Sequence, residues 1–135
     1  MIQKYRVFIS GPMESCGGNM NLPLFHYVAK RLETAGCEVY NPAASFDTDT
    51  FRKMEKQAQI NARRRGMKRN CDWICDVADV MLMLPGWQQS PGAKAEHALA
   101  LSLGLTIREC PTILITDYMY GHDRSDTFRL ELFEA

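Results

Sequence analysis

The chain has 135 residues, the length of one ordinary domain, and its hydrophobic fraction of 46% and charged fraction of 24% exclude disorder over the whole chain. Its 16 basic and 16 acidic residues give a formal net charge of zero, whereas a protein that binds nucleic acid usually carries a basic excess. We therefore expect a single domain over residues 1–135 whose partner is a small molecule and not nucleic acid.

Cysteine usage and the N-terminal sequence indicate the compartment. The five cysteines are an odd number and form no disulfide framework, which is typical of free thiols in a reducing compartment. Residues 1–10 contain no signal-peptide core, and no segment approaches the roughly 20 apolar residues of a membrane span. We expect a cytoplasmic protein without a membrane partner.

Two of these cysteines, Cys71 and Cys75, are one helical turn apart, as a pair of metal ligands would be. No CxxC or HxxxH pattern accompanies them, so buried helix cysteines are the preferred interpretation. We expect no metal site and no cofactor.

The first half of the chain predicts two strands with a helix between them. Residues 5–10 form a short apolar run that a Gly-Pro pair ends, which is typical of a buried strand. A loop rich in glycine, asparagine and serine follows over residues 13–21. Apolar residues then recur at helical spacing over residues 22–35, and residues 37–40 form a second short strand.

The second half continues this alternation. Residues 51–77 have helical composition, with Gly66 as the expected break. Residues 80–84 are apolar throughout, which predicts a central strand buried on both faces. A helix over residues 93–103 and a strand over residues 112–115 follow.

Strands that alternate with helices favour an α/β fold, here a Rossmann-like or flavodoxin-like doubly wound parallel sheet of four to five strands with helices on both faces. The last twenty residues carry weaker signals, and residues 126–133 are either a short terminal helix or a strand. Ligands of such sheets bind beyond the carboxyl ends of the strands. That rule selects the loops over residues 10–21, 41–50 and 85–96.

The loop Ser10-Gly11-Pro12-Met13 is the first candidate for substrate binding. A glycine there lets a ligand approach the backbone, and exposed backbone N–H groups can bind an anion. The pattern is neither GxGxxG nor a P-loop, so it does not favour a dinucleotide or ATPase site. A tight turn at the edge of the core explains the same residues equally well.

The segment from Trp87 to Glu96 is the second candidate. The positive end of the following helix favours a phosphate, and Ser90 and Gly92 precede or begin that helix. Glu96 is expected in its first turn, where the helix dipole favours the ionised form, and a carboxylate in a crevice can attack a sugar carbon. The alternative is that Glu96 only complements the dipole. Trp87 either walls a base-binding pocket or fills the core.

Other charged residues are less specific. Asp72 and Asp76 share a helix face and either supply a proton to a departing base or lie in solvent, while Asp79 is expected to cap or turn the chain before the strand. One basic cluster is either a solvated helix face or faces a phosphate or another subunit. Its members are Arg63, Arg64, Arg65, Lys68 and Arg69.

Together these motifs resemble the nucleoside 2-deoxyribosyltransferase-like family, which includes small deoxynucleoside-5′-monophosphate N-glycosidases and short relatives common in phage genomes. The resemblance covers about residues 4–115. Its most specific part is the S-x-G-x-x-x-E block that ends at Glu96, preceded by Asp72 and the sequence Ala78-Asp79-Val80. The other matching segments are VFISGPM at 7–13 and the tripeptide Tyr40-Asn41-Pro42.

The resemblance implies a role for each matching residue. Glu96 matches the nucleophile that forms a covalent ester with the anomeric carbon of the sugar. Asp72 matches the carboxylate that assists protonation of the departing base, and Asp79 matches a structural position. The substrate-binding loop residues that the family pattern matches are Ser10, Gly11, Met13, Ser90 and Gly92.

Two positions refine the comparison. Ser90 is uncharged where relatives that act on free nucleosides often carry an acidic residue, so a 5′-monophosphate is the expected substrate. Many relatives place a tyrosine on the first strand, but this strand reads Val7-Phe8-Ile9. Tyr5 or another tyrosine would have to supply that hydroxyl.

The expected activity is therefore that of an N-glycosidase that cleaves the base–sugar bond of a nucleoside 5′-monophosphate with retention of configuration. The alternatives are base exchange, as in a nucleoside 2-deoxyribosyltransferase, and a nucleotide-binding sensor without turnover. The family resemblance also implies a homodimer or larger assembly and no metal or organic cofactor.

Overall fold

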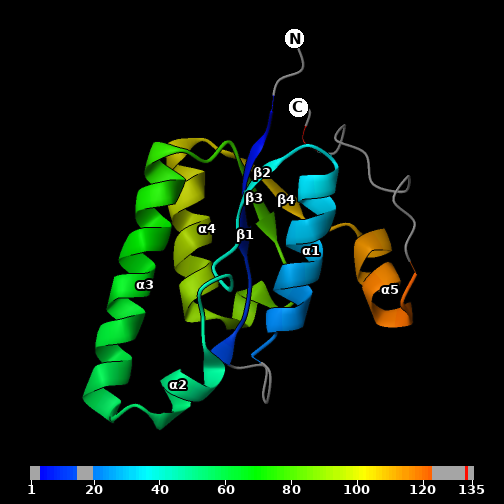
Figure 1. Ribbon diagram of the computed structural model, residues 1–135. Helices are drawn as coiled ribbons and strands as arrows, with labels where there is room; N and C mark the ends of the chain where they lie inside the picture. The colour runs from blue at the N-terminus through cyan, green and yellow to red at the C-terminus, as the bar shows by residue number, and fades with distance from the viewer. Residues whose placement is uncertain (1–3, 15–19, 123–132, 134–135) are drawn as a thin grey trace.

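Four parallel strands form the centre of the molecule in the spatial order β2–β1–β3–β4. The computed structural model describes residues 4–14, 20–122 and 133 (Figure 1). The strands are β1 (Arg6–Ser10), β2 (Glu38–Tyr40), β3 (Val80–Met83) and β4 (Thr106–Glu109). The predicted α/β fold with a parallel sheet is thereby confirmed. The connection that leaves β1 leads to β2 on one side, whereas β3 and β4 lie on the other side. The boundary between β1 and β3 is therefore the topological switch point, where ligand sites of such folds form.

Helices cover both faces of the sheet (Figure 1). One face carries α1 (Leu22–Thr34) and α5 (Thr112–Tyr120), and the other carries α3 (Lys56–Asp76) and α4 (Pro91–Leu103). Two short helices, α2 (Thr48–Lys53) and the 3-10 turn η2 (Trp87–Gln89), lie near the edge at which the strands end. None of the helices in the described residues is long and apolar enough to cross a membrane.

Alternation along the strands divides the core in two. Val7, Ile9 and Leu82 pack with α1, whereas Phe8 and Met81 pack with α3 and α4. This alternation turns Ser10, the last residue of β1, toward the α3–α4 face. Ser10 is fully buried there although it is polar, and it is the first sign of a site at this edge.

The strand predicted over residues 112–115 is wrong, because these residues begin α5. A short apolar run does not distinguish a strand from a buried helix, and the apolar composition continues to the end of α5 at Tyr120. The fourth strand is instead β4, which sequence analysis missed. As an edge strand with the sequence TIRE it is only half-buried and lacks an apolar run.

Two helix predictions also need correction. Gly66 does not interrupt α3, which is continuous for 21 residues; the break lies at Met54 and Glu55, whose extended backbone separates α2 from α3.

The two cysteines of α3 also differ from the prediction. Cys75 is exposed and Cys71 half-buried, so the expectation that both are buried is wrong. No cluster able to hold a metal occurs in the described part of the chain. The prediction for residues 126–133 lies outside the described residues, apart from Phe133, which packs on Tyr5.

The start of β1 is fixed to the start of β3 by one ion pair. Asp79 accepts hydrogen bonds from the backbone N–H of Arg6 at 3.0 Å and from its guanidinium at 3.0 and 3.1 Å. The hydrogen bonds and charge of Arg6 hold the pKa of Asp79 below its ordinary value of 3.8. The prediction that Asp79 has a local structural role fits this arrangement.

We expect Asp79→Asn to lower the free energy of unfolding by about 1 kcal/mol at neutral pH. The pKa of Asp79 is lower in the folded state than in the unfolded state. Its contribution to the free energy of unfolding is therefore complete above pH 3.8 and is lost as the pH falls through the lowered pKa. Urea unfolding of both proteins over a range of pH measures the difference. A difference that stays constant down to the acid limit would contradict an electrostatic origin.

Candidate active site

Glu96 is a buried carboxylate at the edge where the strands end. The helix that carries it, α4, begins at Pro91 with Ser90 as its N-cap, whose side-chain oxygen accepts from the Ala93 N–H at 3.3 Å. Glu96 therefore lies in the second turn of the helix and not, as predicted, in the first. The residue is only 5% exposed.

Two side chains from other elements hold this carboxylate. Ser10 Oγ donates to Glu96 Oε1 at 2.7 Å, and Asn70 Nδ2 on α3 donates to Oε2 at 2.9 Å. The hydroxyl of Tyr40, at the end of β2, donates in turn to Asn70 Oδ1 at 3.0 Å and so fixes the amide with its nitrogen toward Glu96. The carboxylate is thus positioned from β1, β2, α3 and α4 together.

The environment of Glu96 has opposing effects on its ionisation. Burial raises the pKa of this carboxyl, while the hydrogen bonds from Ser10 and Asn70 act to lower it. The sum is a raised pKa, which contradicts the expectation that the environment of Glu96 at the start of the helix favours the ionised form. The reason is that burial outweighs the two hydrogen bonds, and that Glu96 lies beyond the first turn, on which the dipole mainly acts.

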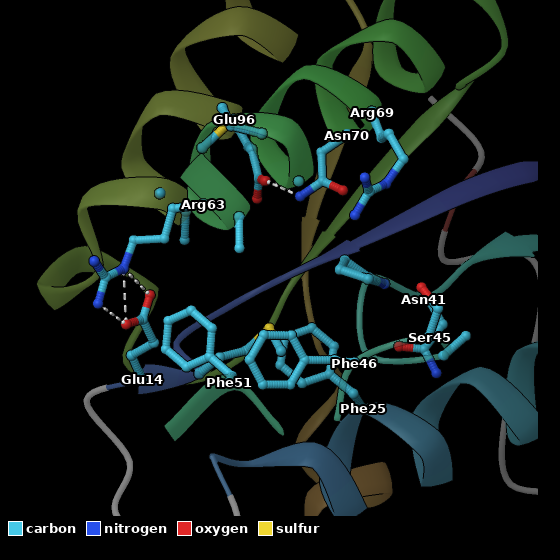
Figure 2. A pocket seen from close by; sticks show the side chains of 18 of the residues that line it. Glu14, Phe25, Asn41, Ser45, Phe46, Phe51, Arg63, Arg69, Asn70 and Glu96 are labelled. Atoms are coloured by element: carbon cyan, nitrogen blue, oxygen red, sulfur yellow. Dashed lines mark hydrogen bonds and ion pairs between the residues drawn. The ribbon is translucent and has the colours of Figure 1, made fainter. Parts of the chain in front are cut away.

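Glu96 and Asn70 line a cavity of about 1010 Å³ between α3, the N-terminus of α4 and the segment that follows β2. Figure 2 shows this cavity with Glu96 and Asn70 on one wall and the rings of Phe25, Phe46 and Phe51 on the opposite wall. The cavity lies beyond the carboxyl ends of β1, β2 and β3, where the fold predicts a ligand.

Charged side chains from α3 also line the cavity. Arg63 makes a bidentate ion pair with Glu14, with nitrogen–oxygen distances of 2.6 to 3.0 Å, and lies over the ring of Phe51. Arg64 and Arg69 line the cavity as well, whereas Arg65 does not. The basic cluster is therefore partly a solvated face and partly a wall of the cavity.

Most of the predicted loop residues meet at this place. Gly11, Met13, Ser90 and Gly92 line the cavity, and Ser10 contacts Glu96 directly. Gly11 is required there because a Cβ would come within 2.7 Å of Leu84 Cβ, on the strand-end segment of β3.

Pro12 differs from its neighbours in this loop. It is buried and does not line the cavity, and its carbonyl accepts a hydrogen bond from Asn21 Nδ2 at 3.0 Å. Its role in the structure is to hold the loop.

Two other predicted residues lie elsewhere. Asp72 is exposed on α3 and paired with Lys68 at 2.9 Å, and it does not line the cavity. It is two residues after Asn70, which turns it by about 200° around the helix, away from Glu96. Trp87 stacks on His97 at 4.3 Å and donates to Glu109 at 3.2 Å, outside the cavity.

Sequence analysis missed Asn70 and Tyr40. Asn70 shares the cavity face of α3 with Arg63 and Met67 at helical spacing, but that face is not apolar, so the sequence pattern does not distinguish it from the solvated faces of the helix. The ring of Tyr40 stacks on the ring of Phe8, with centroids 5.1 Å apart, and its hydroxyl reaches Asn70.

The comparison with family models identifies one match, to the family described as "Domain of unknown function (DUF4406)", over residues 5–109. The chain belongs to the DUF4406 family. The DUF4406 region contains all four strands, α1 to α4 and every residue that holds Glu96, while α5 lies beyond it. Neither the comparison with curated proteins nor that with solved structures gives a match.

The raised pKa of Glu96 has a measurable consequence for stability. Because the folded state holds the proton more tightly than the unfolded state, wild type loses stability as the pH rises from the ordinary value of 4.5 through the raised pKa. We expect Glu96→Gln to lack this loss, so its free energy of unfolding rises relative to wild type over that interval. Denaturant unfolding at several pH values measures it.

The exposed Glu33→Gln variant on α1 controls for the change in formal charge. In Glu96→Gln, the introduced amide turns its nitrogen toward one of the two hydrogen-bond donors, which adds a penalty that does not vary with pH. Only the pH dependence is therefore diagnostic. Parallel pH profiles for wild type and Glu96→Gln would contradict a raised pKa.

Proposed function

We propose that this protein cleaves the N-glycosidic bond of a (deoxy)nucleoside 5′-monophosphate through a covalent glycosyl ester on Glu96. The observation that carries the proposal is the carboxylate of Glu96, 5% exposed, at the wall of a large cavity and held there by Ser10 and Asn70. Evolution rarely buries a carboxylate beside an open cavity for stability, because burial costs free energy.

The two hydrogen-bond donors suit Glu96 to act as a nucleophile. Ser10 and Asn70 both donate, so they favour the ionised carboxylate and orient its oxygens. Burial of this carboxylate removes water that would otherwise shield the attacking oxygen. Attack on the anomeric carbon, followed by attack of water on the ester, inverts that carbon twice and retains its configuration.

The N-terminus of α4 supports a phosphate at one end of the substrate. The positive end of the helix dipole and the backbone N–H of Gly92 attract an anion, whereas the N–H groups of Ala93 and Lys94 already donate to Ser90. Ser90 accepts from the Ala93 N–H with its oxygen, which leaves the hydroxyl hydrogen to donate to a phosphate oxygen. Arg64 adds positive charge to the same cavity.

The proton balance of the reaction differs from that implied by the family resemblance, because Asp72 points away from the cavity. The base leaves with the electron pair of the glycosidic bond and takes a proton from water. The hydroxide that remains is neutralised by the proton released when a second water cleaves the ester. The net reaction consumes one water and regenerates the Glu96 carboxylate.

The proposal also includes self-association and a cytoplasmic location. Exposed Leu101 and Leu103 on α4 support association with another copy, as a homodimer would require. The free thiols of Cys37, Cys71, Cys75 and Cys110 support a reducing, cytoplasmic location.

The test is release of free base from a panel of deoxynucleotides and deoxynucleosides, with and without an acceptor base. We expect release from 5′-monophosphates, and a loss of more than about 1,000-fold in both Glu96→Ala and Glu96→Gln. Asp72→Asn should stay within about threefold of wild type, since its carboxylate lies outside the cavity.

Three outcomes would change the conclusion. Release that survives both Glu96 substitutions would refute the nucleophile. Exchange that requires an acceptor base would make the protein a deoxyribosyltransferase. Tight nucleotide binding without any release would make it a sensor.

A further inference from the structure

Arg69 is a cation on the cavity wall directly next to the residue that holds Glu96. It precedes Asn70 on α3 and lines the cavity on the side of Tyr40. Burial raises the pKa of the Tyr40 hydroxyl, and the charge of Arg69 and a hydrogen bond from it act in the opposite direction. A guanidinium has five N–H donors, so one bond to a hydroxyl leaves the others for a ligand.

The cavity has two ends, and Arg69 lies at the end away from the proposed phosphate site. Gly92, at the N-terminus of α4, lies beside Met67 of α3, one turn before Asn70, and a Cβ on Gly92 would be 3.5 Å from Met67 Cε. Figure 2 shows Arg63 and Glu14 on one side of Glu96 and Asn70, and Arg69 on the other side with Asn41 and Ser45.

A nucleotide placed on these two landmarks directs its base toward Arg69. With the 5′-phosphate at Ser90 and Gly92 and the anomeric carbon at Glu96, the base extends away from the phosphate, past Asn70. The inference therefore rests on the proposed function for the position of the sugar. The cavity volume of about 1010 Å³ leaves ample space for a purine beside the phenylalanine rings.

The side chain of Asn41, at the same end, is already engaged. Asn41 accepts from the Ala43 N–H at 2.9 Å with its oxygen and shares a hydrogen bond with His26 at 3.1 Å through its nitrogen. Arg63, at the opposite end, is neutralised by Glu14. Arg69 is the charged donor group at the end where the base is expected, and the Ser45 hydroxyl beside it has only a single donor.

The chemistry of a guanidinium selects among bases. It presents donors only, in a planar fork that matches two neighbouring acceptors, as the O6 and N7 atoms of guanine do. Hypoxanthine has the same two acceptors. Adenine instead places an amino donor beside N7, and pyrimidines attached through N1 have no equivalent of N7.

We propose that Arg69 recognises the O6/N7 edge of a 6-oxopurine base and stabilises the negative charge that develops on it as the glycosidic bond breaks. The electron pair of the bond between the anomeric carbon and N9 moves into the purine ring while the carboxylate of Glu96 bonds to the carbon. The guanidinium stays protonated throughout and pairs with the departing anion, which then takes a proton from water. Arg69 is in this way a base-recognition residue that also lowers the barrier to departure.

The experiment compares dGMP, dIMP, dAMP, dCMP, dTMP, the nucleoside deoxyguanosine, and 7-deaza-dGMP, which keeps O6 but lacks N7. The kcat/KM for base release is measured with wild type, Arg69→Met and Arg69→Lys. Arg65→Met is the matched control, because Arg65 is exposed on the same helix and does not line the cavity. The dissociation constants of dGMP and dAMP are measured by calorimetry with the Glu96→Gln variant and with the double variant that also carries Arg69→Met. The melting temperature of each variant verifies that it folds.

We expect wild type to prefer dGMP and dIMP over dAMP and over 7-deaza-dGMP by about 10- to 100-fold. Arg69→Met should remove that preference. Its kcat/KM for dAMP should stay within about threefold of the wild-type value. Arg69→Lys should restore little of it, because an ammonium lacks the fork. Arg65→Met should match wild type.

Three results would overturn the proposal: no preference for 6-oxopurines in wild type, an equal loss with every base in Arg69→Met, or a loss of preference for nucleotide over nucleoside, which would make Arg69 a phosphate ligand. If no nucleotide releases its base, the proposed function fails. The calorimetric preference for dGMP over dAMP, and its dependence on Arg69, then still decides the recognition proposal.

Discussion

The hydrogen-bonded carboxylate of Glu96 is the constraint on which the site depends. It needs Ser10 at the end of β1 and Asn70 on α3 at the same time, so three segments far apart in the sequence must meet within hydrogen-bond distance. The parallel pairing of Ser10 with Met83 brings the ends of β1 and β3 together. Gly11 permits this close approach, since any side chain there would collide with Leu84.

The long helix α3 supplies the other half of the arrangement. It is largely polar, and Ile74 is its only fully buried residue in the described structure. A helix with so little apolar surface gains little stability from packing. Its inward positions instead carry groups suited to a ligand, among them Asn70 and the arginines of the cavity wall. The helix thus contributes more to the site than to the core, a compromise common at functional sites.

Parts of the site were predictable because strand ends of a parallel sheet meet at one edge. That rule selected Ser10, Ser90 and Glu96 from the sequence, although they are up to 86 residues apart. The same reasoning missed Asn70, because its direction depends on how α3 is rotated over the sheet, and a polar helix has too weak a periodicity to reveal that rotation. The family resemblance selected Asp72, two residues away and on the other side of the helix.

The fold itself was predictable to a similar degree. The buried strands β1 and β3 were recognised from their apolar runs, since both faces of a central strand are covered. Edge strand β4 was missed for the converse reason, because it is only partly covered and includes the half-buried Arg108 and the exposed Glu109. The apolar start of α5 was then mistaken for the missing strand.

The most direct measurement of the central claim is the mass of the intact protein after rapid quenching with a slowly turned-over 2′-fluoro-arabino nucleoside 5′-monophosphate. We expect the mass to increase by that of the fluorinated sugar phosphate, and peptide fragmentation to assign the adduct to Glu96. The adduct should be absent from Glu96→Gln. Release of base without an adduct on Glu96, or an adduct on another residue, would contradict the covalent role of this carboxylate.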